Sequence, residues 1–274
     1  MLSGKRGVVL GVANERSIAW GCAKACAEHG ACLAFTYLGD AQKKRVSRLI
    51  ESELPGSLLF PCDVARDEDI ISLFSSIADA WGTLDFVIHS VAFAHREDLG
   101  GAFVKTPRSN FLLALDISAY SFVAVAREAS RLMTQGGAIV TMSYFGAEKV
   151  VPRYNVMGVA KAALEACVRY LAYDLGPAGI RVNCVSAGPI RTLSSSAIPG
   201  MKHMLDIVEK WAPLQRNVTQ EEVGRTTAFL VSDLSAGITG EVIHVDSGYN
   251  ILGFTALGEE GKENARPDEN GAAS

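Results

Sequence analysis

The sequence lacks the segments that would carry it into or across a membrane. Its first seven residues, Met1 to Gly7, are too short and too polar for a secretory signal. No uninterrupted apolar run approaches the ~20 residues of a membrane span. We therefore expect a water-soluble, cytoplasmic protein with no membrane partner.

An excess of positive charge is also missing. The chain has 26 Lys and Arg against 30 Asp and Glu, a formal net charge of −4 and a pI near 5.8. Such a balance creates no global basic field, which argues against nucleic acid as a main partner.

Cysteine is scarce, with six residues and no C-x-x-C pair accompanied by histidines. We therefore expect neither a disulfide framework nor a metal site. The cysteines within apolar segments are expected to act as small buried hydrophobes. These are Cys22, Cys26, Cys32, Cys167 and Cys184.

What the sequence does contain is enough apolar material for one large core. The chain has 274 residues, 49% of them hydrophobic. Apolar runs predict strands at residues 7–12, 31–37, 57–60, 85–90, 138–141, 180–185 and 242–246. Between them, helical patterns cover 17–29, the segment ending at 54, 67–81, 110–133, 154–176 and 219–231, the last with a capping box of Thr219 and Glu222.

This alternation predicts an α/β fold, a Rossmann-like, doubly wound parallel sheet forming a single domain over residues 1–254. Residues 255–274 carry much charge and little apolar surface, so we expect a disordered tail. Residues 193–201 are rich in Ser and Gly and suggest a mobile lid. The helix 154–176 is apolar nearly all round, which predicts the sheet on one side and another subunit on the other.

The stretch from Tyr144 to Lys161 holds the candidate catalytic residues. Tyr154 and Lys161 are seven residues apart at the start of a predicted helix, which would place both on one helix face. A nearby ammonium favours negative charge on a phenolic oxygen, so the hydroxyl would donate readily to an oxyanion. The alternative is a tyrosine at the core edge and a solvated lysine tip.

Residues 11–19 predict a phosphate-binding turn between a strand and a helix. Backbone N–H groups there lie beside the positive end of a helix dipole, although the G-x-G-x-x-G spacing is absent and a plain strand–helix turn remains the alternative. Asp63, after its strand, either accepts from an adenine amine or starts a turn. Three basic residues could contact the 2′-phosphate of NADPH or could simply form a solvated helix face: Lys43, Lys44 and Arg45. We expect NADH rather than NADPH. His89 is interpreted as a structural histidine.

These motifs resemble the short-chain dehydrogenase/reductase superfamily and, within it, the NADH-dependent enoyl-[acyl-carrier-protein] reductases. The resemblance covers about residues 4–254. It is carried by Gly11-x5-Ser17-Ile18-Ala19, His89-Ser90-Val91-Ala92-Phe93-Ala94, Tyr144-x9-Tyr154-x6-Lys161 and Ala187-Gly188-Pro189-Ile190-Arg191-Thr192. Ordinary members of the superfamily have a lysine four residues after the tyrosine, where this chain has Gly158.

The resemblance implies an oxidoreductase that reduces the trans-2 double bond of enoyl-acyl carrier protein thioesters with NADH, the last reductive step of type II fatty acid elongation. Tyr154 would stabilise the enolate oxyanion, Lys161 would position the cofactor, and Tyr144 would flank the substrate. Ala94, Tyr144 and Tyr154 would touch the acyl group. The implied cofactor site comprises Gly11, Ala13, Ser17, Ile18, Leu38, Asp63, Val64, Ser90, Val91, Ala92, Lys161, Ile190, Thr192 and Ser194.

Two positions depart from the family pattern. Ala92 stands where glycine is usual, and Leu38 where a polar residue is common near the adenosine. The resemblance also implies a homotetramer. Because acyl carrier protein is acidic, it further implies a basic patch, for which Arg191, Lys202 and Lys210 are candidates.

Two alternatives stay open. The first is a 3-ketoacyl or alcohol dehydrogenase of the same superfamily, whose usual Tyr-x3-Lys is missing here. The second is a non-catalytic NAD-binding regulator, since a fold does not fix a function.

Overall fold

A seven-stranded parallel sheet forms the centre of the computed structural model, which describes residues 1–193 and 200–253. The spatial order is β3-β2-β1-β4-β5-β6-β7, and each neighbouring pair is parallel. The strands are β1 (Arg6–Leu10), β2 (Cys32–Tyr37), β3 (Leu58–Pro61), β4 (Phe86–His89), β5 (Gly137–Ser143), β6 (Ile180–Ala187) and β7 (Val242–Val245). The predicted doubly wound sheet is confirmed. Ser194, most of the predicted lid and the tail 255–274 lie outside the described residues.

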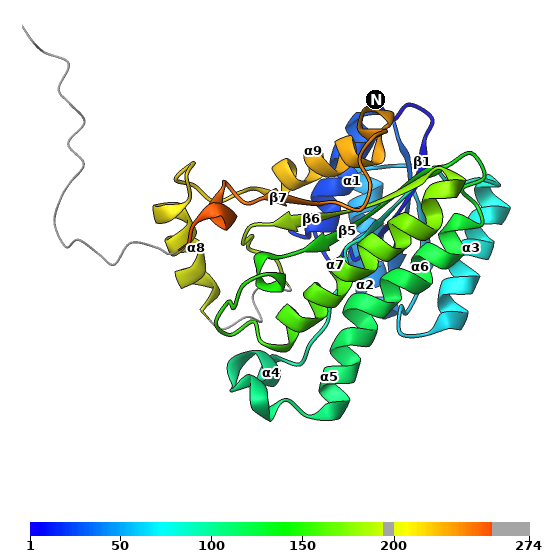
Figure 1. The fold of residues 1–274 in the computed structure, drawn as a ribbon. Coiled ribbons are helices and arrows are strands. Elements are labelled where there is room, and N and C mark those ends of the chain that lie inside the picture. The colour runs from blue at the N-terminus through cyan, green and yellow to red at the C-terminus, as the bar shows by residue number, and fades with distance from the viewer. Residues whose placement is uncertain (194–199, 254–274) are drawn as a thin grey trace, which may run out of the picture.

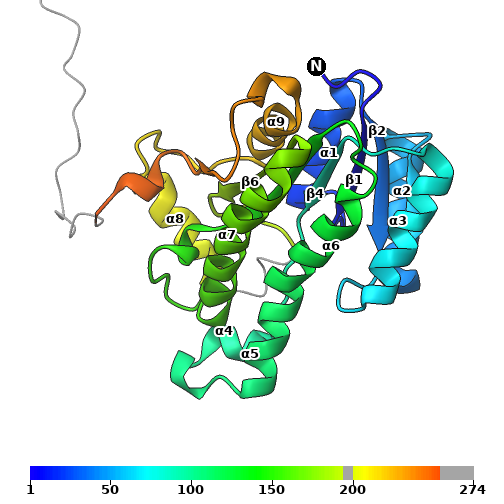
Figure 2. The same ribbon diagram turned by 45° about the vertical axis from the view of Figure 1, so that its right-hand side comes forward.

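Helices cover both faces of the sheet (Figures 1 and 2). On one face lie α1 (Ile18–Glu28), α2 (Gly39–Glu53) and α9 (Gln220–Val231), and on the other lie α3 (Asp67–Trp81), α6 (Ser121–Ser130) and α7 (Val156–Leu175). The strands serve both layers because successive side chains point to opposite faces. In β1, Val9 joins the first core cluster, whereas Val8 and Leu10 join the second.

The predicted capping box at the start of α9 is confirmed. The Thr219 hydroxyl accepts from the Glu222 N–H at 3.3 Å, and the Glu222 carboxylate accepts from the Thr219 N–H at 2.9 Å. Two orphan donors of the helix start are thereby satisfied.

The predicted helix 110–133 consists of three segments. They are α5 (Arg108–Leu115), a π-helical segment (Asp116–Tyr120) and α6. An 18-residue window within residues 108–130 has a mean hydropathy of 1.5, so this stretch is, by length and composition alone, long and apolar enough to span a membrane, although Asp116 interrupts its apolar residues. Phe122, Val125 and Ala129 lie fully buried in the core, which accounts for this apolar composition.

Two helices were not predicted. The short α4 (Arg96–Gly100) follows β4, and α8 (Met201–Trp211) begins where the predicted lid ends. Met201, Met204, Leu205 and Val208 have the i, i+3, i+4, i+7 spacing that could have identified α8. Our expectation for the cysteines was also partly wrong, since Cys32 is exposed at the start of β2 and Cys167 is only half-buried.

Candidate active site

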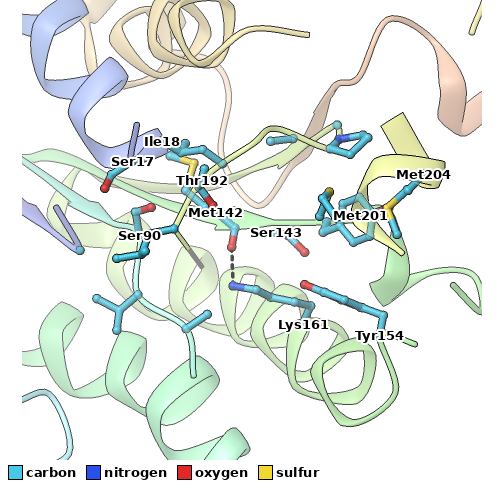
Figure 3. Close-up of a pocket in the computed structure, with 18 residues that line it drawn as sticks. Ser17, Ile18, Ser90, Met142, Ser143, Tyr154, Lys161, Thr192, Met201 and Met204 are labelled. Atoms are coloured by element: carbon cyan, nitrogen blue, oxygen red, sulfur yellow. Dashed lines mark hydrogen bonds between the residues drawn. The ribbon is translucent and has the colours of Figure 1, made fainter. Parts of the chain in front are cut away.

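A pocket with a volume of ≈ 170 Å³ opens at the carboxyl ends of the central strands, where ligands of doubly wound sheets bind. Figure 3 shows its lining, with Tyr154 and Lys161 pointing from the α7 side toward the end of β5. The described lining residues are Gly11, Ser17, Ile18, Ser90, Val91, Ala92, Met142, Ser143, Tyr144, Tyr154, Lys161, Ala187, Gly188, Pro189, Thr192, Leu193, Met201 and Met204. Segments far apart in the sequence therefore meet here as predicted.

Tyr154 lies just before α7 and not on it, which corrects the expected helix start. The backbone at Arg153 and Asn155 has φ of +68° and +43°, and α7 begins at Val156. Residues with a positive φ cannot continue a right-handed helix. Tyr154 and Lys161 therefore do not share one helix face, contrary to our expectation. Tyr154 and Lys161 nevertheless line the same pocket.

The Tyr154 ring is buried in a small apolar cluster. It packs edge-on against Tyr144, with ring centroids 4.9 Å apart, and against Leu99 and Met157. Burial, followed by the neighbouring Tyr144 and Glu165, raises the pKa of Tyr154 well above its usual range. Burial therefore outweighs the lysine field that we expected to favour the phenolate. The raised pKa keeps the Tyr154 hydroxyl protonated at neutral pH, so it is available as a neutral hydrogen-bond donor.

Lys161 is fixed by the strand beside it. Its side chain is almost fully buried, and Nζ donates to the Met142 carbonyl at 2.7 Å. Burial lowers the pKa of Lys161 from 10.5 to about 8, and the acidic groups of Cys184 and Glu165 oppose this shift. The ammonium is thus held at one place by β5 rather than extending into solvent.

The structure explains why no lysine stands four residues after Tyr154. A Cβ atom at Gly158 would lie 2.7 Å from the carbonyl oxygen of Gly146. Any side chain at position 158 would therefore displace the 145–147 turn, whereas Lys161, three residues later, lines the pocket.

The strand–helix turn after β1 provides the second half of the site. Gly11 has φ of +100°, and a Cβ atom there would lie 2.0 Å from the Ser90 carbonyl oxygen, so only glycine fits. The Ser17 hydroxyl accepts from the N–H groups of Ala13 and Asn14, which orders the turn. The first N–H groups of α1, which have no acceptor within the helix, lie beside the pocket. This arrangement fits a pyrophosphate group.

Several predicted cofactor and substrate residues lie outside the described lining of the pocket: Ala13, Leu38, Asp63, Val64, Ile190 and Ala94. Leu38 is 60% exposed before α2. The Asp63 carboxylate accepts from the Ala65 N–H at 3.0 Å, as expected for the turn that was its alternative role. Ala94 packs against the Tyr154 cluster. The roles of these residues stay predictions.

Sequence reasoning missed part of the pocket wall. Met201 and Met204 of α8 line it, and the Tyr144 hydroxyl donates to the Met204 sulfur at 2.9 Å. The apolar spacing of α8 was the available signal. Met142 and Ser143 also line the pocket, and their place at the end of β5 was the corresponding signal.

His89 has the surroundings of a structural residue. It is fully buried, with its ring nitrogens 3.1 Å from the Thr141 hydroxyl and 2.9 Å from that of Ser121. Burial, with a contribution from Lys161, lowers the pKa of His89 to about 3. Within residues 1–193 and 200–253, no group of three or more His, Cys, Asp or Glu could hold a metal ion.

Known proteins match this chain over most of its length. Residues 11–250 match the family described as Enoyl-(Acyl carrier protein) reductase. The chain is 55% identical over 257 residues to enoyl-[acyl-carrier-protein] reductase [NADH] 1 of Rhizobium meliloti, covering 94% of each chain. It superimposes with a TM-score of 0.91 and 55% identity on the Bacillus cereus enoyl-acyl carrier protein reductase crystallised with NADP+ and indole naphthyridinone, covering 92% of this chain and 99% of that one. For the Anaplasma phagocytophilum reductase in complex with NAD, the TM-score is 0.88 at 49% identity, covering 93% and 95%.

Proposed function

We propose a function for this chain from the fact that it belongs to the enoyl-(acyl carrier protein) reductase family. It reduces the trans-2 double bond of enoyl thioesters carried on acyl carrier protein, with NADH as the reductant. The observation that carries the proposal is the meeting of Tyr154 and Lys161 beside the Gly11 turn in one pocket. The pocket thus combines a buried donor, a fixed cation and a phosphate-binding turn.

The residues present fit a dinucleotide. Ser17 and the start of α1 would hold the pyrophosphate, Lys161 would hold the nicotinamide ribose, and Thr192 would line the cofactor site. When bound, the cofactor supplies the hydride. Among relatives, the Rhizobium meliloti protein is named for NADH, which supports the same choice here.

Tyr154 would act on the charge that the reaction creates. Hydride addition to the β-carbon of an enoyl thioester places negative charge on the thioester oxygen, and a donor aimed at this oxygen stabilises the transition state. The raised pKa of Tyr154 keeps its proton in place for this purpose. Lys161 would position the cofactor and add a positive field.

The protein partner would be acidic acyl carrier protein. Arg191, Lys202 and Lys210 are exposed, and Lys202 and Lys210 stand near the two ends of α8, beside the pocket. Asp206 and Glu209 lie between these lysines. Of the three candidates we now favour Arg191 and Lys202 as docking residues, since α8 does not carry a uniformly basic face.

We further infer a cytoplasmic homotetramer. Tyr170 and Tyr173 of α7 are 75% and 83% exposed, and Leu112 of the adjacent α5 is 56% exposed. Large apolar side chains gathered on neighbouring helices favour a protein interface. This supports the expectation that a second copy covers the outer side of α7.

The function is tested by following NADH oxidation with a trans-2-enoyl thioester and, in parallel, with a 3-ketoacyl thioester. We expect turnover of the enoyl substrate only, with a loss of about 10²–10³ in kcat for Tyr154→Phe because that variant removes the donor. Lys161→Ala is expected to raise KM for NADH as well. Turnover of the keto substrate alone would favour the 3-ketoacyl dehydrogenase alternative. NADH binding without turnover would favour the regulator.

A further inference from the structure

Tyr154 lies between two tight turns, each of which contains a left-handed residue. The Tyr154 N–H donates to the Val151 carbonyl at 3.1 Å, closing a turn in which Arg153 has φ of +68°. The Met157 N–H donates to the Tyr154 carbonyl at 3.0 Å, closing a second turn in which Asn155 has φ of +43° and ψ of −119°. Glycine is preferred at this position of such a turn, so an asparagine there is strained unless its surroundings hold it.

The side chain of Asn155 supplies that restraint. Its amide nitrogen lies 2.9 Å from the Asp98 carbonyl oxygen and 2.8 Å from that of Gly101, with the Leu99 carbonyl oxygen at 3.4 Å. An amide NH₂ has two hydrogens, which match the two short contacts. Because all three neighbours are acceptors, only a donor is compatible with this place. Asn155 therefore joins the Tyr154 turn to α4.

The segment that Asn155 holds is a wall beside Tyr154. Leu99 of α4 packs against the Tyr154 ring and Met157, and Ala94 borders the same cluster. The Asn110 amide donates to the Asp98 carboxylate at 2.9 Å, which fixes α4 by a second contact besides that of Asn155. A shift of α4 would therefore be felt directly by the tyrosine ring.

The other flank of the turn touches the opposite wall. The Arg153 guanidinium packs on Gly200, where an added Cβ atom would be 3.3 Å from Nη1. Gly200 precedes α8, which carries Met201 and Met204 into the pocket. The turn that presents Tyr154 thus contacts both elements that border the substrate side.

We infer that Asn155 is a positioning residue for Tyr154. Its amide links the tyrosine to the α4 wall, so that the hydroxyl keeps its aim at the thioester oxygen while the wall contacts the acyl chain. This inference rests on the proposed function. Glycine at position 155 would relieve the backbone strain, but it has no side-chain amide to bind α4. Asparagine therefore accepts the strain and provides this link.

Two substitutions of Asn155 distinguish the effect of its side-chain amide from the effect of the backbone strain. Asn155→Gly removes the amide and relaxes the backbone, whereas Asn155→Asp keeps the shape but presents only acceptors to the three carbonyl oxygens. Gln215→Gly is the matched control, since Gln215 has φ of +50° in an exposed turn and does not line the pocket. Each is measured for kcat, KM for NADH, thermal midpoint and amide hydrogen exchange of residues 96–101.

Both Asn155 variants are expected to lower kcat for an enoyl thioester by about tenfold or more, with KM for NADH changed by less than about twofold. The thermal midpoint of Asn155→Gly is expected to stay close to that of the parent, because relief of the backbone strain offsets the lost hydrogen bonds. Exchange in residues 96–101 should become faster in both variants. Gln215→Gly should leave kcat and this exchange unchanged.

The inference is overturned if kcat of both Asn155 variants stays within about twofold of the parent. It is also overturned if kcat of Asn155→Gly falls only together with the thermal midpoint and NADH affinity, since that pattern indicates a general structural role. A parent enzyme that leaves the enoyl thioester unreduced contradicts the proposed function instead. In that case unchanged exchange at 96–101 would still overturn the link between Asn155 and α4.

Discussion

Among the described residues that line the pocket, Lys161 is the one whose pKa lies nearest neutrality. Burial lowers its pKa to about 8, so the ammonium is lost more than two pH units earlier than in an exposed lysine. Because the ammonium would hold the cofactor, kcat/KM for NADH should fall as the pH rises through about 8. A rate profile from about pH 6 to about pH 10 measures this, and a profile flat across the range would contradict it.

Stability should respond to the same group in the opposite direction. Between pH about 8 and 10.5 the unfolded chain binds more protons at Lys161 than the folded chain does, because the folded pKa is the lower one. The contribution of this residue to the free energy of unfolding therefore rises with pH across that window. Lys161→Met should remove both responses, whereas Lys105→Met, at an exposed position, should remove neither.

At the scale of elements, the 145–147 turn and the start of α7 pack with no spare room. A Cβ atom on Gly146 would lie 2.4 Å from Cδ1 of Tyr154. Gly146→Ala should therefore displace the ring and lower kcat by about tenfold or more, because small misplacements of reacting groups are costly. Steady-state kinetics with an enoyl thioester measures the effect. Gly237→Ala, which adds its methyl group in open space, is the control, and equal rates for the two variants would refute the argument.

The elements also show which parts of the site a sequence can reveal. Apolar runs identified all seven strands, and parallel strands bring their carboxyl ends to one edge, so Gly11, Ser90, Tyr144 and Thr192 were correctly expected to meet. The convergence of Tyr154 with Lys161 was predicted for the wrong reason. A positive φ at Asn155 leaves no pattern in residue types, and helix periodicity alone cannot reveal that Tyr154 precedes α7.

Contacts that depend on packing were equally hidden from the sequence. The pKa of Tyr154 is decided by how completely its ring is covered, which hydrophobicity patterns do not specify. The contact of Leu99 with Tyr154 depends on α4, a helix too short to show a helical hydrophobic periodicity in the sequence. In contrast, the methionines of α8 could have been assigned from their spacing.

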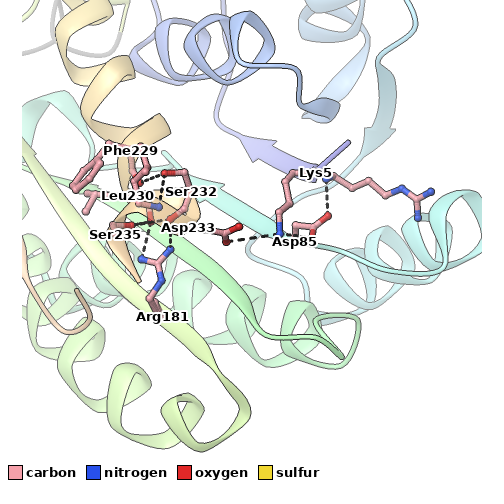
Figure 4. A network of polar contacts seen from close by, with 10 residues as sticks. Lys5, Asp85, Arg181, Phe229, Leu230, Ser232, Asp233 and Ser235 are labelled. Carbon is pink, nitrogen blue, oxygen red and sulfur yellow. Dashed lines mark hydrogen bonds and ion pairs between the residues drawn. The ribbon is translucent and has the colours of Figure 1, made fainter. Parts of the chain in front are cut away.

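At the scale of the whole molecule, Arg181 joins three parts of the carboxyl-terminal half. Its guanidinium donates to the carbonyls of Leu230 and Ser232 at 2.9 Å (Figure 4). It also donates to the Ile238 carbonyl at 3.3 Å. These bonds tie β6 to the end of α9 and to the segment that leads to β7. Arg181→Met leaves half-buried carbonyls unpaired and should lower the free energy of unfolding by about 3 kcal/mol. Urea unfolding measures this loss.

Lys5 supplies the matched comparison for Arg181. It lies 3.5 Å from Asp85 and 3.8 Å from Asp233, but these groups are partly or largely exposed (Figure 4). Lys5→Ala should therefore cost less than about 1 kcal/mol. Because Arg181 does not line the pocket, the initial rate of Arg181→Met at low temperature should match that of the parent. Comparable stability losses for the two variants would contradict the role given to Arg181.

The strand order determines when, during synthesis, the pocket can exist. β1 occupies the middle of the sheet and pairs with β4, with Gly7 beside Phe86, so a growing chain keeps one edge of β1 open until β4 has left the ribosome. The described pocket lining extends from Gly11 to Met204. A nascent chain that stops before α8 has the phosphate-binding turn and Tyr154 but lacks the methionines opposite them. The complete pocket therefore cannot form until α8 has been synthesised, so a nascent chain gains its full binding surface only after most of its translation is over.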